Sequence, residues 1–317
     1  MQDVTIVIPN YNGKILLENC LRTLEQQTYR DFKVLVIDNG SKDGSTEVTS
    51  ETLNMEIVAL KENLGFCGAV NLGIQKTETP YLILLNNDTE VDGHFVEKML
   101  AGVKKSDRIF SCGAQMIDFK NYEIIDNAGD LYTAMGWAVA RGKGKKCADF
   151  EQAVRVFSCC AGAAIYRIDI LKKIGGLDEN HFAYLEDVDL GYRARIAGFE
   201  NWYTPDAKVF HVGSATTGTR YNEKKVFLAA RNTIFVIYKN MPLLQLILNL
   251  PFILLGIIVK TAFFIKKGYA KEYWHGIMEG IRNCDKCRKV PFRFSHLGNY
   301  FRIQLELWSN IVRILRV

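Results

Sequence analysis

The sequence predicts an α/β fold: a doubly wound parallel sheet with helices on both faces, followed by a helical region. Two observations predict the sheet. Short apolar runs alternate with helical patterns, and the runs end in polar, often glycine-bearing loops. An apolar and basic last part of the chain predicts the helical addition. The chain has 317 residues, 48% hydrophobic and 24% charged, which suits one large domain plus an addition.

The first part of the chain contains four expected strands. A short, unbroken apolar run is typical of a strand that is buried on both faces. Such runs occupy residues 4–8, 32–37, 55–60 and 81–85. Between the first and second runs, Leu17, Leu21 and Leu24 recur at helical spacing. After the second run, Ser45 or Thr46 could cap a helix, and after the third, residues 63–71 form a loop that opens another helix.

Polar loops follow three of these strands, at residues 9–13, 38–45 and 86–88. Right-handed crossovers place such loops at one edge of the sheet, where ligands bind in open α/β folds. Carboxylates and amides there can hold a divalent cation and diphosphate oxygens, although a strand that simply ends in a polar turn would look similar. The glycine patterns of dinucleotide sites and of ATP phosphate loops are missing, which disfavours both ligands.

Two later segments leave alternatives open. Residues 110–148 are rich in glycine and charge, and residues 142–146 read as a mobile loop. Residues 159–166 are expected as a strand of small side chains. Such a strand fits close approach of the backbone to a ligand and tight packing alone equally well.

A cluster of carboxylates opens the helix expected after residue 185. Glu186, Asp187 and Asp189 lie in its first turn, where the helix dipole favours acidic residues. Three carboxylates in four positions also repel one another, which raises the pKa of at least one and suits a general base. His211 follows a later strand; a lone histidine is commonly structural, but this one could lie at the edge of the site.

Five segments in this order resemble the family 2 glycosyltransferases, inverting nucleotide-sugar enzymes with the Rossmann-like GT-A fold. They are residues 7–12, 36–45, 84–88, 177–179 and 186–190. The resemblance covers residues 4 to 211 and implies a glycosyltransferase domain at residues 1–225. Residues 226–317 are then expected to form a basic, helical, membrane-associating region.

The resemblance also implies roles for individual residues. Asp187 is similar to the catalytic base, and Asp88 and His211 are similar to the residues that bind Mn²⁺ or Mg²⁺. The residues that it places at the nucleotide are Pro9, Tyr11, Asp38, Asn63, Asn86 and Asn87, with Asp38 accepting the N3–H of a uracil or thymine ring. The residues that it places in support of the base are Glu186, Asp189 and Arg193.

Two departures bear on the expected activity. Asn86 stands at the first acidic position of the Asp-x-Asp motif, which lowers the expected metal affinity. The Gln-x-x-Arg-Trp element of processive synthases is missing, so we expect the addition of one or a few sugars. Residues 65–73 and the pair Arg231-Asn232 look similar to bacterial rhamnosyltransferases of cell-wall and O-antigen assembly, which use dTDP-rhamnose.

The expected function is therefore transfer of L-rhamnose from dTDP-rhamnose to a lipid-linked saccharide, and no nucleic-acid partner is expected. A first alternative keeps the chemistry but uses a UDP-sugar, such as UDP-galactofuranose, UDP-glucose or UDP-N-acetylglucosamine. A second is a weakly active sugar-nucleotide binder that acts as an assembly partner, and Asn86 is its support.

The last part of the chain is basic: residues 260–317 carry 12 Lys/Arg and 4 Asp/Glu, a net charge of +8 in a chain of net charge +5. Residues 243–259 are apolar but are interrupted by Gln245, Asn249 and Pro251, and a spanning helix needs about 20 residues. A buried helical hairpin and a segment lying in the membrane interface both fit this segment.

A second amphipathic helix is expected at residues 297–316. Its apolar stripe comprises Leu297, Tyr300, Phe301, Leu305, Trp308, Ile311, Val312 and Leu315. The largely opposite face comprises Arg302, Glu306, Ser309, Arg313 and Arg316. A basic helix of this kind is typical of a membrane surface, and an interface between copies of the chain is the alternative. We expect peripheral attachment to the cytoplasmic side of the plasma membrane.

The start of the chain and its cysteines are consistent with that location. Met1-Gln2-Asp3 leads straight into the first strand, so no signal peptide is expected, and the eight cysteines are expected as reduced thiols. Cys284 and Cys287 have metal-ligand spacing without a second pair, and we interpret them as structural, with a zinc site as the alternative.

Overall fold

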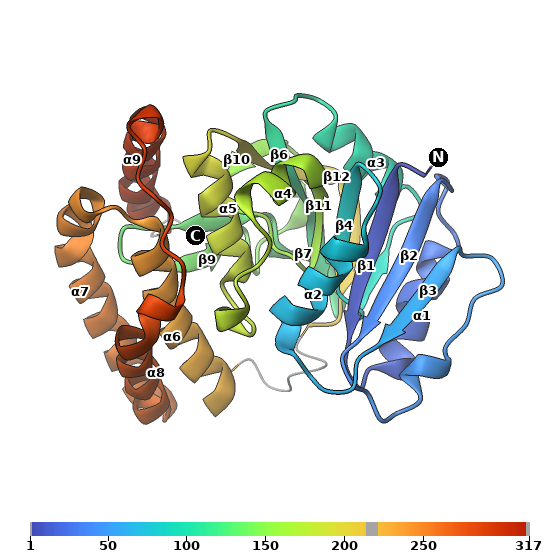
Figure 1. Cartoon of the computed structure of the whole chain (residues 1–317), viewed down its shortest axis with the longest axis horizontal. Coiled ribbons are helices and arrows are strands. Elements are labelled where there is room, and N and C mark those ends of the chain that lie inside the picture. Colours follow the sequence, from blue (N-terminus) through green and yellow to red (C-terminus); the bar gives the residue numbers. More distant parts are fainter. Residues whose placement is uncertain (1, 214–220, 315–317) are drawn as a thin grey trace.

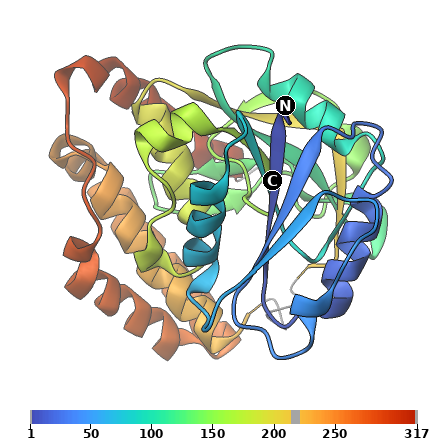
Figure 2. The same ribbon diagram turned by 45° about the vertical axis from the view of Figure 1, so that its right-hand side comes forward.

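The computed structural model describes residues 2–213 and 221–314, in which a sheet with helices on both faces carries a group of C-terminal helices at one side (Figures 1 and 2). The ten strands of the sheet are β1 (Val4–Asn10), β2 (Phe32–Asp38), β3 (Met55–Ala59), β4 (Tyr81–Leu85), β5 (Thr89–Val91), β6 (Ile109–Asp118), β7 (Asn121–Asn127), β10 (Val154–Val156), β11 (Ala163–Arg167) and β12 (Glu200–His211). Strands β8 (Asp130–Tyr132) and β9 (Ala138–Ala140) form a separate hairpin.

The sheet is mixed rather than wholly parallel. Its main path runs β10-β12-β6-β11-β4-β1-β2-β3, and β1 pairs in parallel with both β2 and β4, as the alternation of strands and helices predicts. Strand β11, however, lies antiparallel between β4 and β6. The parallel pairing expected of the first four strands is confirmed, and the sheet becomes mixed beyond β4, where β11 is antiparallel to both its neighbours and β12 pairs in parallel with β6.

Two apolar cores hold the helices on the two faces of the sheet. One core contains side chains from α1 (Lys14–Leu24) and α3 (Phe95–Val103). The other contains side chains from α2 (Gly65–Lys76), α4 (Ile168–Ile174) and α5 (Glu186–Ile196). Short 3-10 turns occupy Ser45–Glu47, Cys147–Phe150, Glu179–His181, Cys284–Lys286 and Phe294–His296. This packing fixes the carboxyl ends of β1, β2 and β4 at one edge, as predicted.

The C-terminal helices pack against the sheet domain through a shared core. They are α6 (Glu223–Asn240), α7 (Leu243–Lys267), α8 (Ala270–Asn283) and α9 (Leu297–Ile314). The shared core combines residues before and after position 225, namely Tyr132, Phe157, Val188, Tyr192, Val236, Ile237, Ile253, Tyr300, Ile303 and Leu307. In Figures 1 and 2 these helices lie beside α5, on the side away from β2 and β3.

Helix α7 buries two amide side chains and exposes most of its large apolar ones. Gln245 and Asn249 are buried: Gln245 Oε1 accepts a hydrogen bond from the Tyr192 hydroxyl at 2.7 Å, and Asn249 exchanges bonds with Gln304 at 2.7 and 3.0 Å. The large side chains that the helix exposes include Leu244, Ile247, Leu248, Leu254, Leu255 and Ile258. Helix α7 is therefore not buried as a whole: it buries Gln245, Asn249, Ile253 and Gly256, and most of its large apolar side chains are exposed.

Helix α9 has one apolar side that packs in the shared core and another that is exposed. The predicted apolar stripe contains residues of both sides. Tyr300 is buried with Ile303 and Leu307 in the shared core, whereas Phe301 and Leu305 are exposed, together with Leu297, Trp308 and Val312. The helix itself is confirmed. The predicted apolar face is wrong because it left out Ile303 and Leu307, which pack on the sheet domain. Leu315 and Arg316 lie outside the described residues.

Candidate active site

Three strand ends are joined by a chain of side-chain hydrogen bonds. Asn10, at the end of β1, donates from Nδ2 to Oδ2 of Asp38 at 2.9 Å and accepts at Oδ1 from Asn87 at 2.6 Å. The other oxygen of Asp38 accepts the backbone N–H of Ser41 at 2.9 Å. The side chains of Asn10, Asp38 and Asn87 are almost fully buried. Each carboxylate oxygen of Asp38 retains a further lone pair, consistent with its predicted acceptor role.

Residues predicted at the nucleoside lie on the loops beside Asp38. Tyr11 is 38% exposed and Pro9 is partly buried at the end of β1. Oδ1 of Asn63 accepts from Asn39 Nδ2 at 3.0 Å and from the N–H of Gly65 at 2.8 Å, which shapes the loop into α2. The structure thus gathers the predicted residues at one edge, and their contacts with a nucleotide stay a prediction.

His211 lies between two carboxylates. Its Nδ1 atom is 2.8 Å from Oδ2 of Asp126, and its Nε2 atom is 3.4 Å from Oδ1 of Asp88. Burial opposes protonation of the ring, but the two carboxylates outweigh it and raise the pKa of His211 to about 9. Burial likewise opposes ionisation of Asp126, yet His211 and Lys143 hold its pKa down at about 2.

The residues at this point fit a divalent cation. Oδ1 of Asp88 is buried and accepts no hydrogen bond from any described residue, and it faces the ring nitrogen that Asp126 does not use. An acidic oxygen and an imidazole whose other nitrogen is held by a carboxylate form a common metal-binding arrangement. Two protein ligands suffice for Mg²⁺ or Mn²⁺ when a diphosphate and water complete the shell.

Asn86 closes the strand end rather than adding a carboxylate. Its N–H donates to the carbonyl of Gly162 at 2.9 Å, and its carbonyl accepts from the Thr89 hydroxyl at 2.6 Å. A side chain at Gly162 would lie 3.1 Å from the Asn86 amide, so the small residue permits this approach. The small residues before β11 thus pack against the strand end, which supports the packing interpretation there.

Asp187 reaches the same strand end from the start of α5. Its Oδ2 atom accepts the N–H of Ala161 at 3.3 Å, one residue from the Gly162 carbonyl that binds Asn86. Its Oδ1 atom accepts the N–H of Val188 at 2.8 Å. Burial raises the pKa of Asp187 above its usual value. The predicted base is therefore a partly buried carboxylate beside the turn that binds Asn86.

Two further carboxyl groups lie near Asp187. Burial, reinforced by the Asp187 charge, raises the pKa of both Glu186 and Asp130 to about 8. Asp130 accepts hydrogen bonds from Asn127 at 2.8 Å and from the Ser158 hydroxyl at 3.3 Å. The prediction that crowding raises the pKa of a carboxylate in this cluster is confirmed, with burial as the larger cause.

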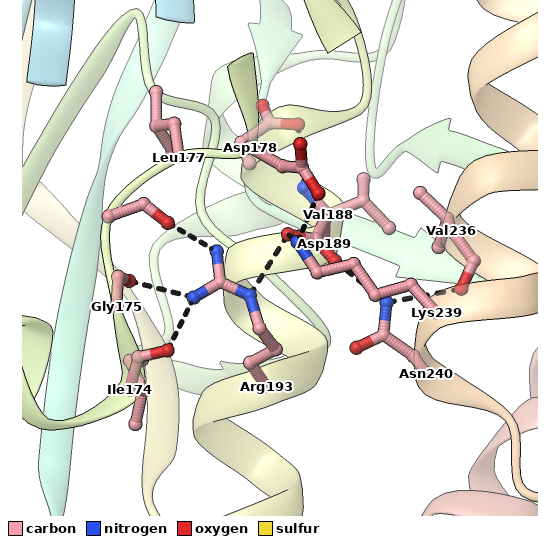
Figure 3. Close-up of polar contacts among 12 residues, drawn as sticks. Ile174, Gly175, Leu177, Asp178, Val188, Asp189, Arg193, Val236, Lys239 and Asn240 are labelled. Atoms are coloured by element: carbon pink, nitrogen blue, oxygen red, sulfur yellow. Dashed lines mark hydrogen bonds and ion pairs between the residues drawn. The ribbon is translucent and has the colours of Figure 1, made fainter. Parts of the chain in front are cut away.

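Asp189 belongs to a separate ionic network, shown in Figure 3. Its Oδ2 atom accepts from Arg193 Nε at 2.9 Å and from Lys239 Nζ at 3.0 Å, and Lys239 also binds Asp178 at 2.8 Å. Burial opposes ionisation, but Arg193 and Lys239 outweigh it and lower the pKa of Asp189. The other donors of Arg193 bind the carbonyls of residues 174 to 176. Asp189 and Arg193 thus form an ion pair within α5, and their support of the predicted base stays a prediction.

Sequence reasoning missed several residues that the fold brings to this region. Asp126 and Asp130 lie in residues 110–148. The only feature of the sequence that could have indicated them is that two carboxylates stand close together beside Asn127. Lys143 binds Asp126 at 2.5 Å from the segment expected as a mobile loop. Lys239 had no signal, because its partners lie 50 and 61 positions away.

Comparison with known proteins shows which family the chain belongs to. The chain is 26% identical to the N-acetylglucosaminyl-diphospho-decaprenol L-rhamnosyltransferase of Mycobacterium tuberculosis over 270 residues, covering 74% of this chain and 86% of that protein. It is 25% identical to the O-antigen chain rhamnosyltransferase RfbN of Salmonella typhimurium over 232 residues, covering 71% and 72%.

The fold is also found in solved glycosyltransferase structures. A crystal structure of GalNAc-T7 with UDP, GalNAc and Mn²⁺ has a TM-score of 0.62 at 17% identity, covering 75% of this chain and 48% of that one. The GT-A fold expected from the sequence is confirmed. Residues 5–175, more than half of the chain, match the sequence pattern of Glycosyl transferase family 2. The chain therefore belongs to glycosyltransferase family 2.

Proposed function

We propose that this protein transfers a sugar from a nucleoside diphosphate to a hydroxyl group with inversion at the anomeric carbon, and that Asp187 is the base. One observation carries the proposal. The partly buried carboxylate of Asp187, whose pKa is raised, accepts the N–H of Ala161, and the carbonyl of the next residue, Gly162, binds Asn86 at the end of β4. A carboxylate in that position can take the proton of the attacking hydroxyl.

We propose the remaining roles from the resemblance to the family, and the arrangement of the strand ends supports them. Asp38, with Pro9, Tyr11 and Asn63, binds the nucleoside, and Asn87 holds Asn10 against Asp38. A divalent cation between Asp88 and His211 would offset the charge that develops on the departing diphosphate. No second carboxylate is proposed as a nucleophile, because Glu186 and Asp130 are buried and burial disfavours their charged form.

We propose dTDP-rhamnose as the donor and a lipid-diphosphate-linked saccharide as the acceptor. The names of the two relatives described above support rhamnose, and the name of the mycobacterial protein supports the acceptor. A UDP-sugar is the competing donor, since GalNAc-T7, a protein of the same fold, was crystallised with UDP.

A panel of dTDP- and UDP-sugars tests the proposal, with purified protein, Mn²⁺ or Mg²⁺ and a lipid-linked acceptor. We expect turnover of dTDP-rhamnose that is abolished by EDTA. Turnover of a UDP-sugar alone would overturn the donor and keep the mechanism. Binding of nucleotide sugars without any transfer would favour an assembly partner, the function class that Asn86 in place of an aspartate suggests.

We further propose that residues 226–317 attach the glycosyltransferase domain, residues 1–225, to the cytoplasmic face of the membrane. Within the described parts of the chain, α7 is the one helix that is long and apolar enough to cross a bilayer. Only 22% of its most apolar stretch of 18 residues is buried. Polar residues that face the protein and leucines that face outward are the pattern of lipid-exposed helices. Lys266 and Lys267 then lie at the end of α7, where they can meet anionic headgroups.

Vesicle flotation tests the attachment. Replacement of the exposed Ile247, Leu254 and Ile258 by glutamine should release the protein from anionic vesicles, since these side chains do not contribute to the shared core. The matched control replaces the exposed Ile15 and Tyr122 of the sheet domain, and these variants should stay bound. Unchanged vesicle binding of the α7 variant, with loss of oligomers, would favour an interface between copies.

A further inference from the structure

The segment that leads into Asp187 has an unusual backbone. Phe182, Tyr184 and Leu185 have φ angles of +61°, +75° and +65°, the left-handed region that side chains with a Cβ rarely adopt. None of the three is a glycine, asparagine or aspartate. A short segment with three such residues persists only where its surroundings hold it, and strain of this kind is concentrated at functional sites.

One buried side chain of α6 holds this segment. The Nδ2 atom of Asn232 lies 3.0 Å from the carbonyl oxygen of His181 and 2.8 Å from those of Ala183 and Tyr184. Asn232 is fully buried, and its Oδ1 atom accepts from Nε of Arg231 at 3.0 Å. An amide with two N–H groups that serves three carbonyls fixes the path of the backbone between them.

Further contacts from α6 hold the residues on both sides of the segment. Arg231 donates from Nη2 to the carbonyls of Asn180 and His181 at 2.8 and 2.9 Å. Two turns further along α6, Lys239 binds Asp178 and Asp189, which flank the segment (Figure 3). Helix α6 thus holds the chain before, within and after the strained residues.

The held segment also touches the loop that shapes the predicted nucleoside pocket. The N–H of Cys67 donates to the carbonyl of Phe182 at 3.2 Å, and a side chain at Gly65 would lie 2.5 Å from the Phe182 ring. Displacement of the segment would therefore alter the position of Asp187 relative to the donor site. A misplacement of about 1 Å can cost about a hundredfold in rate.

We propose that Asn232 is a positioning residue of the transferase: it holds residues 181–185 in their strained path and thereby aims Asp187 at the acceptor hydroxyl. Its partner Arg231 reinforces the same path. The proposal rests on the proposed function, in which Asp187 is the base. It makes α6, a helix of the C-terminal region, part of the apparatus that sets the turnover rate.

The test compares Asn232→Ala with Asn310→Ala in the full-length protein. Asn310 is an equally buried amide that joins the C-terminal region to the sheet domain, donating to the carbonyl of Tyr132 at 2.9 Å, but it does not contact residues 181–185. We measure kcat, the dissociation constant of dTDP or UDP, and hydrogen exchange of peptides. Arg231→Gln is included as a milder variant in case Asn232→Ala does not fold.

For Asn232→Ala we expect a loss of kcat of tenfold or more, less than threefold change in nucleotide affinity, and faster exchange confined to the peptide around residues 181–187. Arg231→Gln should show a smaller change in the same direction, and Asn310→Ala none of this pattern. Equal losses in the Asn232 and Asn310 variants, or unchanged exchange and kcat in both Asn232→Ala and Arg231→Gln, would overturn the proposal. Exchange reports on the segment even if the wild-type protein transfers no sugar, so failure of the proposed function is distinguishable.

Discussion

The Nε2 atom of His211 lies 3.4 Å from Oδ1 of Asp88, and the opposite ring nitrogen is held by Asp126. Neighbouring ligands of an octahedral cation with bonds of about 2.1 Å lie about 3 Å apart, so a small adjustment would let both atoms bind one ion. We propose that this pair binds the metal in place of the Asp-x-Asp motif, in which Asn86 stands where a second carboxylate would.

Removal of either atom of the pair should weaken metal binding. For Asp88→Asn and His211→Ala we expect at least a tenfold lower affinity for Mn²⁺ in the presence of dTDP or UDP, measured by titration calorimetry or by Mn²⁺ spin resonance. Asp206→Asn, an exposed carboxylate on the same strand as His211, is the control. Equal affinity in all four proteins would exclude this pair as the metal site.

Asp126 should matter for the metal without binding it. Its carboxylate fixes the orientation of the His211 ring, and loss of such a partner commonly costs 10- to 100-fold in metal affinity. Asp126→Asn should therefore lower Mn²⁺ affinity by about tenfold, measured with the same titration. Lys143→Met, which removes the other partner of Asp126, should have a smaller effect; the reverse order would contradict the role given to Asp126.

Asp130 should make stability depend on pH. Its pKa is raised to about 8 in the folded chain, above its unfolded value, so the folded state binds more protons between about pH 4 and pH 8. Stability should then fall as the pH rises through this window, by up to about 1.4 kcal/mol per pH unit for this group. Asp130→Asn should flatten part of the fall in denaturant titrations, whereas the exposed Asp169→Asn should not; parallel curves for wild type and Asp130→Asn would contradict this.

Lys239 should contribute strongly to stability. Lys239→Met leaves Asp178 and the buried Asp189 without their shared cation, and breaking a buried ion pair costs about 3 to 5 kcal/mol. Lys33→Met removes a partly exposed pair with Glu56 and should cost about 1 kcal/mol or less. Similar unfolding free energies for the two variants would show that the network in Figure 3 has no special weight.

The sequence predicted the parts of the fold that depend on local pattern. Apolar runs followed by polar turns located β1, β2, β3 and β4, and the acidic start of α5 was placed at Glu186, where the structure has it. The antiparallel entry of β11 was not predictable, because the same residues fit either direction. The buried face of α9 was misassigned since Ile303 and Leu307 pack on residues far away in the sequence.

The site was predicted only where its residues end strands or open helices. Asp88 and Asp187 follow such signals, whereas Asp126, Asp130 and Asn232 act through partners that only the folded chain brings near. The separation of Asp189 from the other carboxylates likewise depends on Lys239 of α6. Long-range pairing of this kind has no periodicity in the sequence.

Turnover of Asp187→Asn tests most directly the proposal that Asp187 is the base of an inverting transfer. We would measure kcat, its pH dependence and donor affinity, with Asp169→Asn as the exposed control. We predict a loss of kcat of about 10²- to 10⁴-fold with donor affinity kept. Wild-type kcat should rise with pH through a pKa above the usual aspartate value. Near-normal turnover of Asp187→Asn would contradict the account.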